Sequence, residues 1–203
     1  VGLLAAVALN RKFPGRIAFR TIFYLPVLTS LIAASVVWMY IYEPYSGLLN
    51  GVLVMIGLDP QPWLQSPALA MPALILMAIW RDFGTAMIIY LAGLQGINSE
   101  LYEAAGLDGA NAWQKFIHVT LPQLAPTTFF VTVMLTIQSF KVFDQVYMIT
   151  QGGPGTSTLV LVYHIYNEAF ISWDLGYSSM IALVLFLLVL VVTVVQFRRQ
   201  RED

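Results

Sequence analysis

The sequence predicts an all-α integral membrane protein, and three observations support this fold class. The 203 residues are 59% hydrophobic and only 10% charged, whereas ordinary soluble domains carry about 25% charged residues. The apolar residues are gathered into runs long enough to cross a hydrocarbon layer of about 30 Å. The basic residues outside these runs fall on one side of the predicted topology. Because the net charge is only −1, a strongly basic nucleic-acid-binding protein is excluded as well.

Four apolar runs predict complete membrane spans, at about residues 21–42, 68–97, 126–149 and 176–197. The first and the last contain 22 uncharged residues each, which reach about 33 Å as an α-helix. The second is interrupted at residues 80–84 (Trp-Arg-Asp-Phe-Gly), and we expect it to be broken or kinked there. Residues 1–9 are too short to cross alone and are expected to be the end of a span truncated upstream. We expect residues 1–203 to form a single membrane domain.

The basic residues predict the orientation of the chain. Lys and Arg near span ends are retained on the cytoplasmic side. If the spans alternate, eight basic residues share one side, namely Arg11, Lys12, Arg16, Arg20, Lys115, Arg198, Arg199 and Arg201. The loops at about 43–67 and 150–175 contain no Lys or Arg and are expected to be external. This distribution predicts a multi-pass protein of the cytoplasmic (inner) membrane, with segment 98–125 and the C-terminus in the cytoplasm.

Segment 98–125 is too polar to cross the membrane and predicts a helix–turn–helix. Asn98 or Ser99 is suited to cap a helix over about residues 99–106. Gly106 and Gly109 permit a left-handed or close-packed turn. A second short helix is predicted at 112–120, before Leu121-Pro122.

This segment resembles the signature loop of binding-protein-dependent ABC importer permeases. That loop has Glu-Ala-Ala, three residues, Gly, nine residues, Ile, one residue and Leu-Pro. The positions that match are Glu103, Ala104, Ala105, Gly109, Leu121 and Pro122, and Val119 stands at the Ile position. The resemblance implies a type I permease fold in which the loop, including Gly106 and Asp108, forms a coupling helix that sits in a cleft on an ATP-binding subunit.

Three further runs resemble the carbohydrate branch of this family, in the subunit similar to the maltose-type larger permease: Tyr24-Leu25-Pro26, Leu91-Ala92-Gly93-Leu94-Gln95 and Thr150-Gln151-Gly152-Gly153-Pro154. Glycerol phosphate permeases share this pattern, so a sugar and glycerol 3-phosphate both remain open as the solute. The resemblance implies a second permease subunit, two ATP-binding subunits and an extracytoplasmic solute-binding protein as partners. The sequence has no Gly-x-x-x-x-Gly-Lys-Ser/Thr loop. We therefore expect ATP to be bound by partner subunits, and this chain to hold no cofactor and to be no enzyme itself.

Polar residues within the spans before and after the coupling loop are candidates for the solute path, because buried polar groups in a membrane are costly. Combined with the resemblance, this selects Trp80, Asp82, Thr85, Gln138, Ser139, Lys141 and Asp144. An alternative is that Arg81 with Asp82, and Lys141 with Asp144 one helical turn apart, simply neutralise each other.

Two other classes of function fit the sequence less well. A stand-alone secondary transporter would explain a broken span but would leave the coupling motif without a role. A membrane enzyme would need a convergent acid, base or nucleophile set, and only scattered polar residues are present. The chain has no cysteine, and His118 and His164 have no second ligand at metal spacing, so we expect no metal site.

Overall fold

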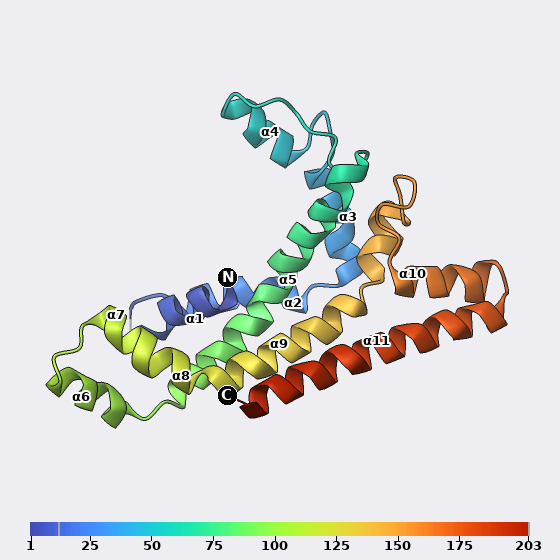
Figure 1. Ribbon diagram of the computed structural model, residues 1–203. Helices are drawn as coiled ribbons and strands as arrows, with labels where there is room; N and C mark the ends of the chain where they lie inside the picture. Colours follow the sequence, from blue (N-terminus) through green and yellow to red (C-terminus); the bar gives the residue numbers. More distant parts are fainter. Residues whose placement is uncertain (12, 203) are drawn as a thin grey trace. The chain divides into compact units, whose positions relative to one another are not determined.

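The computed structural model describes residues 1–11 and 13–202, and their regular secondary structure is entirely helical (Figure 1). The all-α prediction is confirmed for this part of the chain. Lys12 and the side chain of Arg201, both used in the charge argument, lie outside it. In chain order, with η for a π-helical turn, the elements are α1 (Gly2–Asn10), α2 (Arg16–Leu28), α3 (Leu31–Ile41), α4 (Leu48–Met55), α5 (Pro67–Gln95), α6 (Ser99–Leu107), α7 (Ala112–Lys115), η1 (Phe116–Thr120), α8 (Leu121–Gln123), α9 (Ala125–Phe140), η2 (Val146–Thr150), α10 (Leu161–Tyr166), η3 (Asn167–Ile171) and α11 (Leu175–Glu202).

The chain divides into two compact units. The first consists of Val1–Leu28 and Arg81–Leu135, and the second of Thr29–Trp80 and Thr136–Asp203. Helices α5 and α9 contribute residues to both units. The single-domain description of residues 1–203 stays a prediction.

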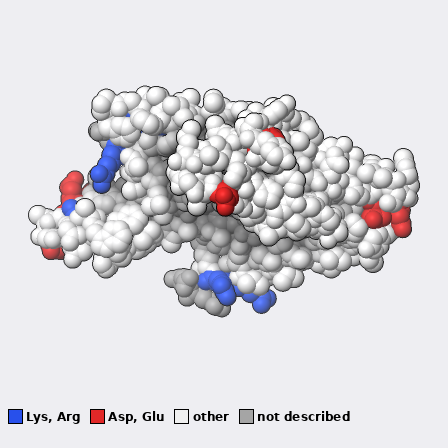
Figure 2. Space-filling model, turned by 90° about the horizontal axis from the view of Figure 1, so that it is seen from above, with Lys and Arg blue, Asp and Glu red and all other residues white. Residues whose placement is uncertain are grey.

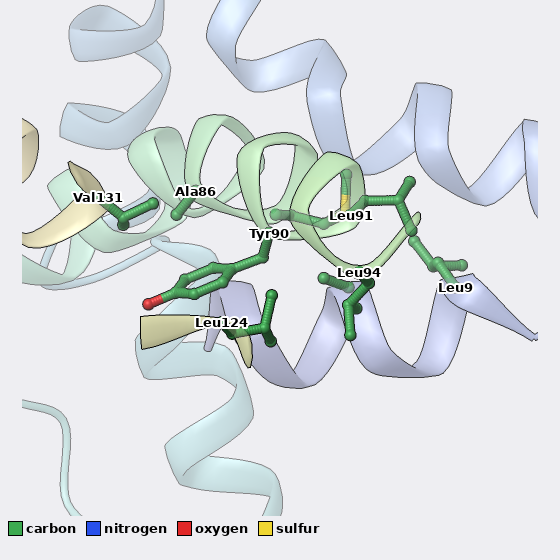
Figure 3. Packing of buried hydrophobic residues seen from close by; sticks show 9 residues of the cluster. Leu9, Ala86, Tyr90, Leu91, Leu94, Leu124 and Val131 are labelled. Carbon is green, nitrogen blue, oxygen red and sulfur yellow. The ribbon is translucent and has the colours of Figure 1, made fainter. Parts of the chain in front are cut away.

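The core of the first unit is built around the second half of α5. Tyr90, Leu91 and Leu94 of α5 pack with Leu9 of α1 and with Leu124, the residue between α8 and α9 (Figure 3). All five side chains are buried. Because lipid is as apolar as these side chains, such packing is stabilised mainly by dispersion contacts and close fit rather than by exclusion of water.

Helix α5 is continuous through residues 80–84, so the predicted break is wrong. Charged and aromatic residues do not break a helix, and an isolated glycine costs only about 1 kcal/mol relative to alanine. Gly84 instead marks a close approach of α2: a Cβ built on it would lie 2.5 Å from the Phe23 carbonyl oxygen and 3.0 Å from Val27 Cγ2. Small residues at such positions let membrane helices pack backbone to backbone.

The span predicted at 21–42 is interrupted, because α2 ends at Leu28 and α3 begins at Leu31. Pro26 lies inside α2. A proline has no N–H, and its ring clashes with the carbonyl one turn earlier, which weakens the helix around it. Ser30 then has an extended backbone, with φ −56° and ψ 129°. The run is therefore two helices rather than one.

The span predicted at 126–149 is also interrupted. Helix α9 ends at Phe140, and the chain leaves helical geometry before residues 144–150, which include η2. By contrast, the span predicted at 176–197 lies entirely inside α11. In the described part of the chain, Pro67–Gln95 and Leu175–Gln200 are long and apolar enough to cross a bilayer alone. The number rises to as many as four if α2 with α3, and residues Ala112–Gln123 with α9, each form one bent span.

The second unit has an aromatic core. The Trp38 ring of α3 lies 5.2 Å from that of Tyr42 and 5.5 Å from that of Trp80, measured between ring centroids. The Tyr42 side chain is fully buried, and its hydroxyl donates a 2.7 Å hydrogen bond to the Ala73 carbonyl of α5. These contacts hold α3 against the first half of α5. On the face in Figure 2, charged side chains form a few small groups and most of the visible surface carries none, as expected for a protein surrounded by lipid.

Asn50 of α4 holds the loop between α3 and α5 together. Its side-chain amide donates to the Pro44 and Gln61 carbonyls, both at 2.9 Å. Its oxygen accepts from the Gln61 backbone N–H at 3.0 Å and from Trp63 Nε1 at 2.9 Å. The residue is only 2% exposed. The loop is thus fixed at both ends by one side chain that uses its full hydrogen-bonding capacity.

Replacing Asn50 with Ala should loosen this loop, because two carbonyls of half-buried residues, a backbone N–H and an indole N–H would lose their partner. We expect a loss of roughly 3 kcal/mol in the stability of the loop. Hydrogen exchange measured by mass spectrometry should show faster exchange over residues 43–66 and unchanged exchange in α11. Exchange at the wild-type rate throughout this loop would contradict the assignment. Gln61→Ala is the matched control, since the backbone groups of Gln61 make the bonds and its side chain can be removed without losing them.

Candidate functional site

The predicted coupling segment forms the expected helix, turn and helix within the first unit. Helix α6 spans Ser99–Leu107, and the Asn98 side chain caps it by accepting a 3.1 Å hydrogen bond from the Glu100 N–H. Gly109 has φ +78°, so the left-handed turn predicted here is present. A side chain at Gly109 would meet no atom within 4 Å. Glycine is needed there for backbone conformation and not for space.

The return helix predicted at 112–120 is present and runs without a gap over Ala112–Gln123, through α7, the π-helical turn η1 and α8. Asn111 and Gln114 form a reciprocal capping box at its start. The Tyr102 hydroxyl of α6 lies 2.9 Å from Thr120 Oγ1 of η1. A Cβ on Gly106 would lie 3.0 Å from Lys115 Nζ. The Tyr102–Thr120 contact therefore joins the two arms, and the end of the Lys115 side chain reaches across to Gly106.

Most of the motif residues face outwards from this unit. Glu103, Ala104, Gly106, Asp108, Gly109, Leu121 and Pro122 are exposed, and Ala105 is half-buried. The acidic groups Glu103 and Asp108 stand beside small residues, so a partner could approach the backbone closely while pairing its own basic groups with the carboxylates.

Sequence reasoning missed two exposed apolar side chains in the same segment. Leu107, the last residue of α6, is 91% exposed, and Trp113 of α7 is 67% exposed. The Trp113 ring stacks on Phe116, with 5.8 Å between centroids. Large apolar side chains exposed in a polar segment indicate a protein contact surface, and Trp is frequent among the residues that dominate such contacts. The sequence did contain a signal for this surface, namely two large apolar residues beside the motif in an otherwise polar segment.

The solute-path candidates fall in different units, Asp82 and Thr85 in the first and the other five in the second. Asp82 and Thr85 are half-buried on α5. Trp80 is half-buried too, and its ring packs edge-on against Trp38, so part of its surface belongs to the aromatic core. Gln138 and Ser139 are exposed at the end of α9, where the Ser139 hydroxyl donates 2.8 Å to the Thr136 carbonyl.

Lys141 and Asp144 lie on either side of the break after α9, and both are exposed. Residues 142 and 143 are not helical. The alternative in which Lys141 and Asp144 neutralise each other one helical turn apart is therefore wrong. No ion pair joins them in the described part of the chain. Each charge remains available to a ligand or partner. No cluster of three His, Cys, Asp or Glu side chains suited to a metal ion occurs among the described residues.

Comparison with known proteins assigns the chain to a family. Residues 1–200 match the family described as binding-protein-dependent transport system inner membrane component. The chain belongs to this family. A probable ABC transporter permease protein of Pyrococcus horikoshii is 40% identical over 194 residues, which are 95% of this chain and 66% of that protein. The arabinooligosaccharides transport system permease protein AraP of Bacillus subtilis is 37% identical over 204 residues, 98% of this chain and 64% of that protein.

The trehalose/maltose transport system permease protein MalF of Thermococcus litoralis is 36% identical over 208 residues, covering this chain completely and 69% of that protein. The fold agrees with this family. A crystal structure of a bacterial ABC transporter that imports the acidic polysaccharide alginate contains a chain with a TM-score of 0.84 and 27% identity, over 99% of this chain and 71% of that one. The type I permease fold is thereby confirmed. The chain spans slightly less than two thirds of the first two relatives, 66% and 64%.

Proposed function

We propose that this chain is the core of a permease subunit of an ABC importer, which moves a sugar inwards at the expense of ATP hydrolysed by partner subunits. The observation that carries the proposal is the exposed loop from Glu103 to Pro122. It presents the family motif on a helix–turn–helix whose turn depends on a left-handed Gly109. A stand-alone transporter would have no use for a rigid, outward-facing acidic turn with exposed Leu107 and Trp113.

In the proposed mechanism the loop between α5 and α9 transmits force. An ATP-binding subunit holds the turn in a cleft, pairs basic groups with Glu103 and Asp108, and covers Leu107 and Trp113. When two such subunits close on ATP, the turn moves with them. Because the Tyr102 hydroxyl bonds to Thr120, both arms move together, and the movement passes to α5 and α9.

The proposed orientation places this loop and the C-terminus in the cytoplasm. The supporting observation is that the loops at 43–67 and 150–175 have no Lys or Arg, whereas the segments on the opposite side of the predicted topology carry eight basic residues. The external loops would then receive a solute-binding protein. One of the similar structures is an alginate transporter in complex with a periplasmic protein that holds an alginate pentasaccharide. A second permease subunit would complete the path.

We propose a sugar as the solute class, in preference to glycerol 3-phosphate. Relatives that carry a substrate in their names are transport proteins for arabinooligosaccharides, lactose and trehalose/maltose. The alginate importer is likewise a carbohydrate transporter. The exposed side chains of Gln138, Ser139 and Asp144 offer amide, hydroxyl and carboxylate groups of the kind that bind sugar hydroxyls.

The test is the ATPase activity of the complete complex in lipid, with its solute-binding protein, across a panel of oligosaccharides, monosaccharides and glycerol 3-phosphate. We expect one sugar to stimulate hydrolysis and to accumulate inside the vesicles. Accumulation of glycerol 3-phosphate alone would show that the solute is glycerol 3-phosphate and not a sugar. Solute accumulation that does not depend on ATP would show that the protein is a stand-alone transporter and not part of an ABC importer.

A further inference from the structure

Helix α4, in the loop between α3 and α5, has the reverse of the polarity that a surface helix normally shows. Its one polar side chain, that of Asn50, is buried and turned towards the loop. Its large apolar side chains lie on the outside, where Leu48 is 68% exposed, Val52 is 48% exposed and Met55 is 87% exposed. A surface helix of a water-soluble protein instead places its apolar stripe on the core and its polar residues in solvent. Water alone is therefore an unfavourable surrounding for α4.

The apolar stretch continues past both ends of the helix. Residues 47–58 are 12 residues long, and all except Asn50 are apolar or glycine. Leu49 packs against the aromatic core of the second unit, but Ile56 and Leu58, which follow the helix, are exposed. A helix that is apolar all round belongs in a protein core or in a membrane. Since most of this stretch is outside the core, the membrane is the surrounding that fits it.

Polar and aromatic residues mark the two ends of this stretch. Hydrogen bonds from the backbone N–H groups of Ser46 and Tyr45 hold the pKa of the Glu43 carboxyl below its usual value, so this group is charged at neutral pH. Asp59 follows the stretch directly. The rings of Tyr45 and Trp63 flank it, and such rings are frequent at the level of the lipid head groups. A segment with charged ends and an apolar middle suits the boundary between head groups and acyl chains.

The C-terminal end of α4 has its backbone groups satisfied within the chain. The Gly57 N–H donates to the Val54 carbonyl at 3.1 Å, and the Leu58 N–H donates to the Leu53 carbonyl at 2.9 Å. Gly57 has φ +80°, the left-handed conformation that turns the chain back over the last carbonyls of a helix. Unsatisfied peptide groups are costly in hydrocarbon. This helix end is therefore suited to an apolar layer.

A protein partner fits the outer side of α4 less well than lipid does. Protein interfaces contain about one hydrogen bond per 100–200 Å² and have a polar rim. The outer side of α4 has no side-chain donor or acceptor, because the amide of Asn50 is fully used inside the loop. Figure 1 shows α4 beyond the N-terminal end of α5, apart from α10 and α11 of the same unit. Acyl chains need no hydrogen bonds from the surface that they cover.

We propose that α4 lies in the interface of the outer leaflet, with Leu48, Val52 and Met55 in contact with acyl chains, and that it anchors the loop between α3 and α5 to the bilayer. Its eight residues extend about 12 Å, so α4 stays within one leaflet. Interfacial helices bury their apolar side about 5–10 Å into the boundary of the acyl layer. The outer leaflet follows from the proposed orientation, whereas the contact with lipid does not depend on the solute.

The experiment uses single cysteines on α4 in the complete complex in proteoliposomes. Because the chain has no cysteine, the complex with the wild-type chain gives the background of the partner subunits. A nitroxide label is attached to Val52→Cys or Met55→Cys. Power saturation in electron paramagnetic resonance then compares collisions of the label with oxygen, which enters lipid, and with a polar nickel chelate, which stays in water.

The oxygen-to-nickel ratio at both positions should exceed that at Thr156→Cys by on the order of tenfold, because moving a polar group into an apolar medium costs at least about 1.4 kcal/mol. Thr156→Cys is the matched control, since Thr156 is exposed among small and polar residues in the other loop predicted to be external. If one α4 variant does not assemble, Leu48→Cys takes its place.

A ratio equal to that of the control would show that α4 lies in water and would overturn the proposal. A label that neither reagent reaches would show that a protein covers the helix. A high ratio that is lost when the solute-binding protein is added would identify that protein as the cover. Both of these results would overturn the lipid contact. The measurement does not require transport, so a complex that imports no sugar can still show α4 in lipid.

Discussion

Replacing Glu103 with Lys is expected to abolish ATP-driven uptake while leaving the fold and the affinity of the binding protein for its solute intact. Glu103 is exposed in the first unit, so a lysine there meets no steric barrier. If the loop docks on an ATP-binding subunit, the reversed charge would face the partner's basic groups. Like charges at an interface cost several kcal/mol, so uptake should fall by on the order of a hundredfold.

Three measurements test this prediction: uptake into proteoliposomes, ATPase activity, and co-purification of the ATP-binding subunits. Glu103→Gln removes the charge without reversing it and should cause a smaller loss. Glu168→Lys is a charge reversal in the loop that is predicted to be external, and it should leave the ATP-binding subunits attached. Uptake at the wild-type rate in Glu103→Lys would show that this loop does not couple transport to ATP hydrolysis.

Replacing Gly84 with Ala should destabilise the first unit by about 3 kcal/mol, the upper part of the range for overpacking a close contact. The new Cβ would lie 2.5 Å from the Phe23 carbonyl oxygen and 3.3 Å from Tyr24 Cα, both backbone atoms of α2. Backbone cannot rotate out of the way as a side chain can, so α2 must move away from α5. Thermal unfolding of the purified complex should detect the loss.

Gly51→Ala is the matched control, because it is the same substitution in another helix and its Cβ would meet nothing within 4 Å. Alanine favours a helix over glycine by roughly 1 kcal/mol, so Gly51→Ala should be neutral or stabilising. The two substitutions are therefore expected to have opposite signs. Equal effects would indicate that α2 and α5 do not approach each other closely at Gly84.

Much of this fold followed from local properties of the sequence. Helix α11 was predicted because 22 uncharged residues in a row leave no other structure in lipid. Helix α6 was predicted within one residue, because Asn98 is a strong cap and Gly109 a strong stop. In both cases the deciding residues lie inside or beside the element that they determine.

The errors concern residues whose role depends on distant partners. Residues 80–84 suggested a break, but Gly84 is small because α2 passes it closely, and no local pattern reveals that neighbour. The interruption after α2 had a local signal in Pro26, which hydropathy alone ignores. The contact between the Phe143 and Tyr166 rings could not be predicted, because these residues meet only after the chain between them has folded back.

The early end of α9 has a consequence for the thickness of the membrane around it. Its 16 residues extend about 24 Å, some 6 Å less than a typical hydrocarbon core. A span shorter than the bilayer is accommodated by local thinning or by water and partner protein at its end. Non-helical backbone is tolerated at this depth only where it is buried in protein or borders water. The peptide groups at 141–143 thus imply that water or a neighbouring subunit reaches into the hydrocarbon layer at this point.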